Sequence, residues 1–302
     1  DIQKLRVNLF DGFRFNRNEK KDDDRYNKGI GGLNFILDHM KNIFCSNNEI
    51  QFNYLKNWVM KLIYGIKLRT MIYLRSDEQG MGKTKFVCNF LMDIIGKKLC
   101  HTLNNDKCFE QFNSVFYGKV LVCLSEITHD YKSSKDLYGK LKQYITDDSI
   151  SYRKMRTEDI QLDNITSIIS IQNKDSMKIE ENDKDRRVFC CDMSDKIKNK
   201  EYCDQYDLYT SNMDVMYAFF WYCIENVNLN WDEVDELRKA PISNEKKRLY
   251  LNASDSITDF LKYLVVGDEV NTFDWVDVWI KPKELFDHYV KWCADEHHKH
   301  FY

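Results

Sequence analysis

A glycine-rich segment followed at once by a lysine and a threonine lies in the first third of the chain. The sequence RSDEQGMGKT stands between a short β-rich run, TMIYLRS, and a helical apolar run, KFVCNFLMDIIG. Glycines let backbone N–H groups curl around phosphate oxygens, and the start of the next helix adds the positive end of its dipole. Lys83 would reach the β- and γ-phosphates of a nucleotide, and the Thr84 hydroxyl would bind Mg²⁺. The segment therefore predicts a site for ATP and Mg²⁺.

The predicted phosphate loop departs from the usual pattern at one position. The loop comprises Asp77, Glu78, Gln79, Gly80, Met81, Gly82, Lys83 and Thr84. The pattern GxxxxGK[ST] has a glycine first, whereas this chain has Asp77, an acid at the mouth of a site for anions. A glycine-rich turn that only caps a helix is the alternative interpretation. The strand before the loop and the helix after it favour the nucleotide site.

Polar residues also follow two later apolar runs of strand length. Glu126 ends VLVCLSE, where a carboxylate could orient and deprotonate the water that attacks a γ-phosphate. Ser125 precedes it and could bind Mg²⁺ through a water molecule, although it brings no charge. Asn173 closes TSIISIQN, and its amide could position the same water. Taken alone, Glu126 could be an exposed acid at a strand end and Asn173 a turn residue.

Two groups of basic residues suggest contacts with a neighbouring subunit and with nucleic acid. Arg186 and Arg187 begin a strand-like run, and one of them could stabilise the transition-state charge on a neighbour's nucleotide. A second group lies between two strand-like runs and could contact a DNA backbone: Arg153, Lys154 and Arg156. Solvated arginines and a solvated loop are the alternatives.

Composition limits the classes of protein that fit. The 302 residues are 43% hydrophobic and 14% aromatic, which is enough for a sizeable core. With 45 Lys and Arg against 48 Asp and Glu, the net charge is −3, so nucleic acid could be bound only by a local patch. No apolar run approaches the ~20 residues of a membrane span. The N-terminal DIQKLRVNLF lacks the pattern of a signal peptide, and the cysteines are scattered, so we expect an intracellular protein.

The periodicity of the apolar residues predicts an α/β fold with a parallel sheet. Unbroken apolar runs of strand length are typical of buried parallel strands. We expect strands near 70–76, 120–124, 166–172 and 187–193, a hairpin within 149–162, and helices near 33–44, 50–63, 85–96, 135–145, 214–224, 256–265 and from 282 onward. Residues 16–32 are expected to form a solvated loop, and 231–248 a linker. The expected divisions are an N-terminal segment and helical bundle (1–66), a core (67–228), and a linker with a C-terminal region (229–302).

The quoted segments together resemble the superfamily 3 helicases, which are ring-forming AAA+ ATPases of DNA viruses and mobile elements. The resemblance is strongest to the helicase part of primase–helicases from large DNA viruses, virophages and phages, and it covers roughly residues 50–250. SDEQGMGKT corresponds to Walker A, VLVCLSEI to Walker B, LKQYITDDSISYRK to the B′ region and SIISIQN to motif C.

The resemblance implies a fold, an activity and partners. It implies an AAA+ P-loop core with a helical N-terminal bundle and a small winged-helix-like C-terminal region. It further implies a hexameric ring that hydrolyses ATP with Mg²⁺ and translocates on single-stranded or fork DNA, in the host cytoplasm or a viral factory and without a membrane partner. A primase region of the same polypeptide could precede this chain.

The resemblance also assigns roles to single residues. Glu126 corresponds to the second acid of Walker B, Asn173 to the motif C asparagine, and Lys154 to a basic residue that grips the DNA backbone. Arg186 and Arg187 lie where the family keeps an arginine pair. Asp77 and Ser125 depart from the family pattern and favour a second function, a ring-forming assembly or loading module that binds ATP without unwinding DNA. A third alternative, which does not depend on these two residues, is an RNA-virus superfamily 3 ATPase.

Overall fold

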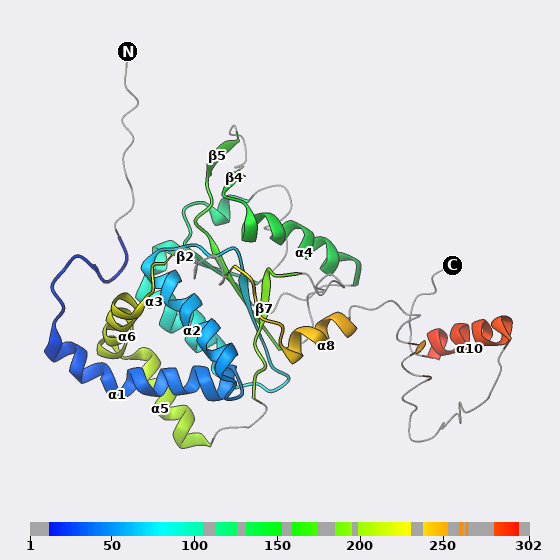
Figure 1. Ribbon diagram of the computed structural model, residues 1–302, viewed down its shortest axis with the longest axis horizontal. Coiled ribbons are helices and arrows are strands. Elements are labelled where there is room, and N and C mark those ends of the chain that lie inside the picture. Colours follow the sequence, from blue (N-terminus) through cyan, green and yellow to red (C-terminus); the bar gives the residue numbers. More distant parts are fainter. Residues whose placement is uncertain are drawn as a thin grey trace, which may run out of the picture.

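A five-stranded parallel sheet forms the centre of the chain. The computed structural model describes residues 12–104, 113–125, 131–152, 159–173, 185–194, 199–230, 238–252, 260–261, 264 and 281–295. The strands are β1 (Met71–Arg75), β2 (Cys100–Leu103), β3 (Leu121–Ser125), β6 (Ser167–Gln172) and β7 (Val188–Cys190). Their order across the sheet is β2-β3-β6-β1-β7, and each strand is parallel to its neighbours (Figure 1). The sheet predicted from the apolar runs is present, and β2 is an edge strand that the sequence pattern did not indicate.

The strand order brings three chain segments together at the carboxyl edge, which is the end of the sheet where the strands finish. In the register, Ile171 of β6 lies beside Leu74 of β1 on one side and beside Ser125 of β3 on the other. All three strands run in the same direction, so the residues that follow them meet at the carboxyl edge. Ligands of open α/β sheets bind at this edge. Because β6 lies between β1 and β3, Asn173 stands between the phosphate loop and the end of β3.

Helices cover both faces of the sheet, and alternating side chains decide which helices each strand contacts. Ile72 and Leu74 join one buried cluster, whereas Met71 and Tyr73 join another. The first cluster includes residues of α1 (Asp23–His39), η1 (Met40–Phe44), α2 (Glu49–Tyr64), η2 (Lys85–Leu91), α3 (Met92–Ile95) and α6 (Met213–Asn226). The second includes residues of α4 (Tyr131–Thr146), β4 (Ser149–Tyr152) and α8 (Asn244–Asn252). The N-terminal helices and the sheet therefore share one continuous core.

The expected solvated loop over residues 16–32 is wrong for its second half, because α1 begins at Asp23. The Asp22 side chain accepts a hydrogen bond from the Arg25 amide and so caps the helix. The glycines that suggested a loop instead let α1 pack closely on α6. A Cβ on Gly29 would lie 2.1 Å from the Asp214 carbonyl oxygen, and one on Gly32 would lie 2.3 Å from Val215.

Two further helices differ from the sequence prediction. Helix α5 (Lys200–Ser211) was not predicted, and it packs near the phosphate loop. Helix α8 occupies the end of the expected linker 231–248, where Lys246 and Leu249 are buried because they pack against β7 and its neighbours. Helix α10 (Pro282–Asp295) begins at Pro282 as predicted.

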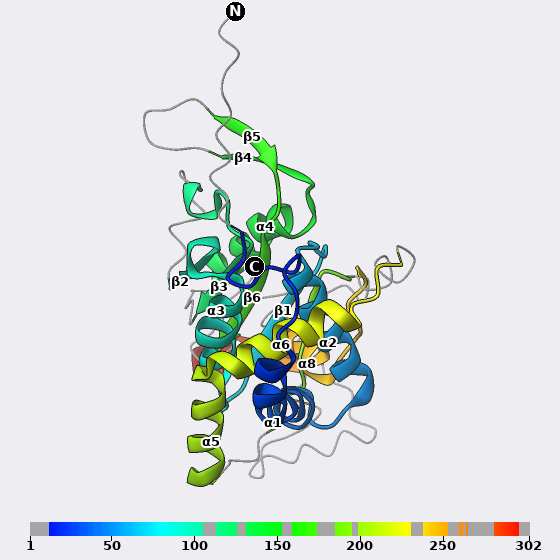
Figure 2. The ribbon, with the colours of Figure 1, turned by 90° about the vertical axis from the view of Figure 1, so that its left-hand side faces the viewer.

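A two-stranded hairpin is separate from the main sheet. Strand β4 pairs with β5 (Ile160–Asp163) in antiparallel register, from Ser149↔Asp163 to Tyr152↔Ile160. Residues 164–166 connect β5 directly to the start of β6, so the hairpin stands at the amino edge of the sheet. In both views it lies at the end of the molecule opposite to α1 and α5 (Figures 1 and 2). Among the described residues, no helix has both the length and the apolar character needed to cross a membrane.

Candidate nucleotide-binding site

The phosphate loop connects β1 to the helix that begins at Lys83. Gly80 and Gly82 have φ angles of +79° and +77°, in the left-handed region that favours glycine. Space restricts Gly82 as well, because a Cβ there would lie 2.6 Å from the ring of Tyr206, whereas nothing lies within 4 Å of a Cβ on Gly80. Glycine is therefore required at the two positions for different structural reasons. Gly80 needs the backbone conformation, and Gly82 needs both the conformation and the missing side chain.

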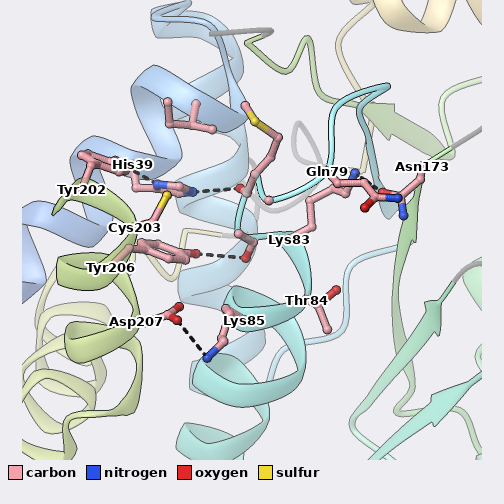
Figure 3. Close-up of a pocket in the computed structure, with 14 residues that line it drawn as sticks. His39, Gln79, Lys83, Thr84, Lys85, Asn173, Tyr202, Cys203, Tyr206 and Asp207 are labelled. Atoms are coloured by element: carbon pink, nitrogen blue, oxygen red, sulfur yellow. Dashed lines mark hydrogen bonds and ion pairs between the residues drawn. The ribbon is translucent and has the colours of Figure 1, made fainter. Parts of the chain in front are cut away.

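Lys83 joins the phosphate loop to the end of β6. Its side chain is buried, with 7% exposure. The ammonium group donates to the Asn173 Oδ1 at 2.9 Å (Figure 3). It also donates to the Gln172 carbonyl at 2.9 Å and to the Ser76 hydroxyl. The Ser76 hydroxyl in turn donates to the Glu78 carbonyl at 2.7 Å. A buried cation is thereby held by neutral oxygens at the carboxyl edge of the sheet, where the sequence predicted an anion site.

The acid at the mouth of the loop is paired with a cation. The Asp77 carboxylate contacts the guanidinium of Arg75, which also lies 3.7 Å from Glu245 of α8. The Asp77 side chain is 75% exposed, so solvent further screens its charge. The departure of Asp77 from the glycine pattern therefore places a neutralised carboxylate, and not a free one, beside the loop.

A cavity of about 470 Å³ opens beside the loop. Its lining comprises His39, Ile43, Gln79, Gly80, Met81, Gly82, Lys83, Thr84, Lys85, Asn173, Tyr202, Cys203, Tyr206 and Asp207. Thr84 is exposed at the start of the helix, on the side of the loop that faces β6 (Figure 3). The glycines, a buried lysine and a free hydroxyl give this cavity the donors and the ligand that a magnesium nucleotide needs.

The end of β3 faces the same helix. Cys123 of β3 contacts Cys88 of η2, with 3.7 Å between the sulfur atoms. Side chains alternate along a strand, so Ser125 lies on the same face as Cys123 and two residues nearer the carboxyl edge. This position suits a hydroxyl that binds Mg²⁺ through water. Glu126, the predicted catalytic base, lies outside the described residues.

The far wall of the cavity comes from α1 and α5, and the sequence interpretation missed it. His39 stacks on Tyr206 with 4.0 Å between ring centroids, and the Tyr202 hydroxyl lies 2.9 Å from Nδ1 of the same imidazole. Burial raises the pKa of Tyr202 to about 12 and that of Tyr206 well above its usual value, so both phenols stay protonated. The spacing of Tyr202, Tyr206 and Tyr209 after Asn199 is a helical signal that could have revealed α5.

The arginine pair lies at the opposite edge of the sheet from the phosphate loop. The Met71 amide at the start of β1 donates to the Arg187 carbonyl at 2.8 Å. The loop begins after Arg75, about 13 Å further along β1 at ~3.3 Å per residue. Arg187 also lies 3.7 Å from the buried Asp185, whereas Arg186 is exposed. Neither arginine therefore lies beside the phosphate loop.

The hairpin predicted to contact nucleic acid has its two strands, β4 and β5, as expected. The three basic residues assigned to its tip lie outside the described residues: Arg153, Lys154 and Arg156.

Comparison with known proteins identifies a phage relative. The DNA primase-polymerase of Nitratiruptor phage NrS-1 is 24% identical over 221 residues, which are 72% of this chain and 29% of the phage protein. The solved apo structure of the NrS-1 C-terminal region matches with a TM-score of 0.57 and 19% identity, over 81% of this chain and 61% of that one. The chain has the fold of the NrS-1 C-terminal region. The resemblance to primase–helicase proteins that was inferred from the motifs is confirmed at the level of fold.

A match to a family model covers the predicted segments of the site. Residues 74–187 match the family described as "Family of unknown function (DUF5906)", and this range runs from the end of β1 to Arg187. JCV helicase gives a TM-score of 0.35 at 14% identity, over 80% of this chain and 73% of that one. The chain spans less than a third of the NrS-1 primase-polymerase and about three fifths of its solved C-terminal region.

Proposed function

We propose that this chain is the ATP-hydrolysing helicase part of a replication protein of a virus or mobile element. The observation that carries the proposal is the position of Lys83. Its buried ammonium group lies at the carboxyl edge of a parallel sheet, between a glycine loop and Asn173. The relation to a phage primase-polymerase supports a role in genome replication, and it makes a primase region elsewhere in the same polypeptide part of the proposal.

The described residues fit a magnesium nucleotide and suggest a division of roles. Loop amides and Lys83 would hold the phosphates, while Thr84 would bind Mg²⁺ directly and Ser125 would bind it through water. The metal would neutralise charge that develops on the phosphates. Glu126 would deprotonate the attacking water. Lys83 must turn from Asn173 toward the phosphates, which frees the Asn173 side chain to position that water.

The same proposal includes assembly and DNA. Because Arg186 lies at the edge of the sheet away from its own phosphate loop, it would act on the nucleotide of a neighbouring subunit, in a homo-oligomeric ring that we propose to be a hexamer. The basic tip of the hairpin would contact the backbone of single-stranded or fork DNA. Subunits that hydrolyse ATP in turn would then move the ring along one strand.

We also propose that the C-terminal region, 229–302, is winged-helix-like. An aromatic cluster separate from the main core supports a small folded unit there. The ring of Phe260 lies 5.5 Å from that of Tyr289 and 5.7 Å from that of Trp292 on α10. The divisions at residues 66 and 228 belong to the same proposal.

Steady-state ATP hydrolysis, measured with and without single-stranded DNA, tests the function. We expect magnesium-dependent turnover that DNA stimulates, and a loss of at least ~10²-fold in Glu126→Gln, because a positioned acid–base group contributes at least that much. Ser125 favours a second candidate, because it brings no charge to the metal shell. An assembly or loading module would bind ATP and form rings, but DNA would not stimulate its turnover and it would not unwind a fork.

A further inference from the structure

Two consecutive carbonyl groups of the phosphate loop are held from outside the loop. The Tyr206 hydroxyl of α5 donates to the Gly82 carbonyl at 3.1 Å, and the His39 Nε2 of α1 lies 3.3 Å from the Met81 carbonyl oxygen (Figure 3). A carbonyl oxygen only accepts hydrogen bonds, so Nε2 carries the imidazole proton. The Nδ1 atom then accepts from the Tyr202 hydroxyl at 2.9 Å. A chain of donors therefore runs from Tyr202 through His39 to the loop.

Because of the geometry of the peptide bond, these contacts to the carbonyl groups fix the direction of the following N–H groups. In a planar trans peptide, the C=O and N–H groups point in opposite directions. When His39 holds the Met81 carbonyl toward α1, the Gly82 N–H must point away from it. The Gly82 carbonyl accepts from the Phe86 amide of its own helix at 2.9 Å and from Tyr206, so the Lys83 N–H must likewise point away from both donors. Amides at a helix start that face outward in this way are the donors that bind phosphate.

Packing keeps the two donors in place. Tyr206 is 4% exposed, stacks on His39 and lies so close to Gly82 that a Cβ there would overlap its ring. Phe35 packs on both tyrosines of α5 that take part in the contact, Tyr202 and Tyr206. The donors therefore have little freedom to leave the loop.

We propose that Tyr206 and His39 are positioning residues that hold the phosphate loop in its anion-binding conformation before a nucleotide arrives. This inference rests on the proposed nucleotide site. It assigns to α5 a role in affinity for the nucleotide, since a loop that is already oriented has less freedom to lose on binding. Neither residue needs to touch the phosphates.

The test is Tyr206→Phe, which keeps the stacked ring and removes only the hydroxyl. The matched control is Tyr209→Phe on the same helix, which removes a hydroxyl that accepts a hydrogen bond from the Gln205 side chain. We expect Tyr206→Phe to bind a fluorescent ATP analogue with Mg²⁺ about 5-fold more weakly, the equivalent of one net hydrogen bond. KM for ATP should rise by the same factor while kcat changes less than about 2-fold. The control should match the wild type.

A readout without nucleotide separates this inference from the function it rests on. Amide hydrogen exchange at Gly82 and Lys83 should be faster in Tyr206→Phe than in the wild type and in Tyr209→Phe. If the wild type binds no nucleotide, or if Lys83→Ala binds it equally well, the proposed function fails. The hydrogen-exchange comparison at Gly82 and Lys83 would still test whether Tyr206 holds the loop. Unchanged exchange together with unchanged nucleotide affinity in Tyr206→Phe would overturn the inference alone.

A second variant guards against a failure to fold. Tyr202→Phe leaves Tyr206 intact and removes only the donor to His39 Nδ1. It should weaken nucleotide binding in the same direction by about 2-fold, because it loosens one of the two carbonyl contacts. If Tyr206→Phe does not fold and Tyr202→Phe binds and exchanges like the wild type, the inference is also overturned.

Discussion

The Lys83 ammonium group and the Asn173 side-chain oxygen are joined by a hydrogen bond of 2.9 Å between the phosphate loop and the end of β6. One contact thus links the residue proposed to bind phosphate with the residue proposed to position water. A nucleotide that draws Lys83 toward its phosphates must break this bond. Binding of the substrate and release of Asn173 for the chemical step would then be a single event.

Lys83→Ala should abolish nucleotide binding and turnover, because it removes the cation at the centre of the site. A matched control is Lys97→Ala, which removes an exposed lysine that pairs with Asp93 after the end of the same helix. Titration with an ATP analogue and Mg²⁺ measures the difference. Equal affinity in the two variants would show that phosphate binds elsewhere.

Asn173→Asp should weaken nucleotide binding more than Asn173→Ala does. A carboxylate in place of the amide would make a charge-assisted bond to Lys83, roughly twice as strong as a neutral one, and would also repel the phosphates. The alanine variant instead releases Lys83 and should lose mainly turnover. The ratio of the two dissociation constants checks this, and a ratio near one would contradict the competition between Asn173 and phosphate for Lys83.

Alanine substitutions of the two arginines should affect different properties of the protein. Arg186 is exposed, so Arg186→Ala should fold and bind ATP normally but lose about 10³-fold or more in turnover, as expected of an arginine that acts in trans. Arg187 pairs with the buried Asp185, so Arg187→Ala should mainly lower the melting temperature. Mixing Arg186→Ala with Lys83→Ala protein should restore part of the activity. If the ATPase rate per subunit does not depend on protein concentration, and neither Arg186→Ala nor Arg187→Ala changes it, the trans contact is ruled out.

Gly29→Ala should destabilise the fold by about 1–3 kcal/mol, the usual cost of overpacking, because its methyl group would overlap the Asp214 carbonyl of α6. Gly31→Ala, two residues away on the same helix, has no atom within 4 Å of its new Cβ. That control should stabilise the protein by about 0.5–1 kcal/mol, because alanine is the better helix former. Urea denaturation of both variants checks the contrast in sign.

Local pattern was enough to predict the elements that carry the phosphate loop. A strand, two glycines, Lys83 and a helix are contiguous, and Asn173 follows an apolar run that was predicted to be a buried strand and is one. The glycines of α1 led to the wrong prediction of a solvated loop. Gly29 and Gly32 resemble loop residues until α6 is known to lie against them, and that contact joins segments almost 200 residues apart.

The α5 wall of the cavity could not be predicted for a related reason. Nothing near Tyr206 in the sequence marks it as a neighbour of Gly82, because the contact depends on how α5 packs on α1 and η2. His39 likewise reads as one residue of an apolar helix face. Motifs record chemistry that is local in sequence, whereas the groups that orient the loop come from helices on either side of it.

The position of the arginine pair at the amino edge has a consequence for symmetry. In the proposed ring, the pocket at one edge of a subunit would face the arginine at the other edge of its neighbour, which is a head-to-tail, heterologous contact. An open row of subunits would always keep one pocket without an arginine at one end and one arginine without a pocket at the other. Closure into a ring completes every site, so the number of active sites would itself report whether the assembly is closed.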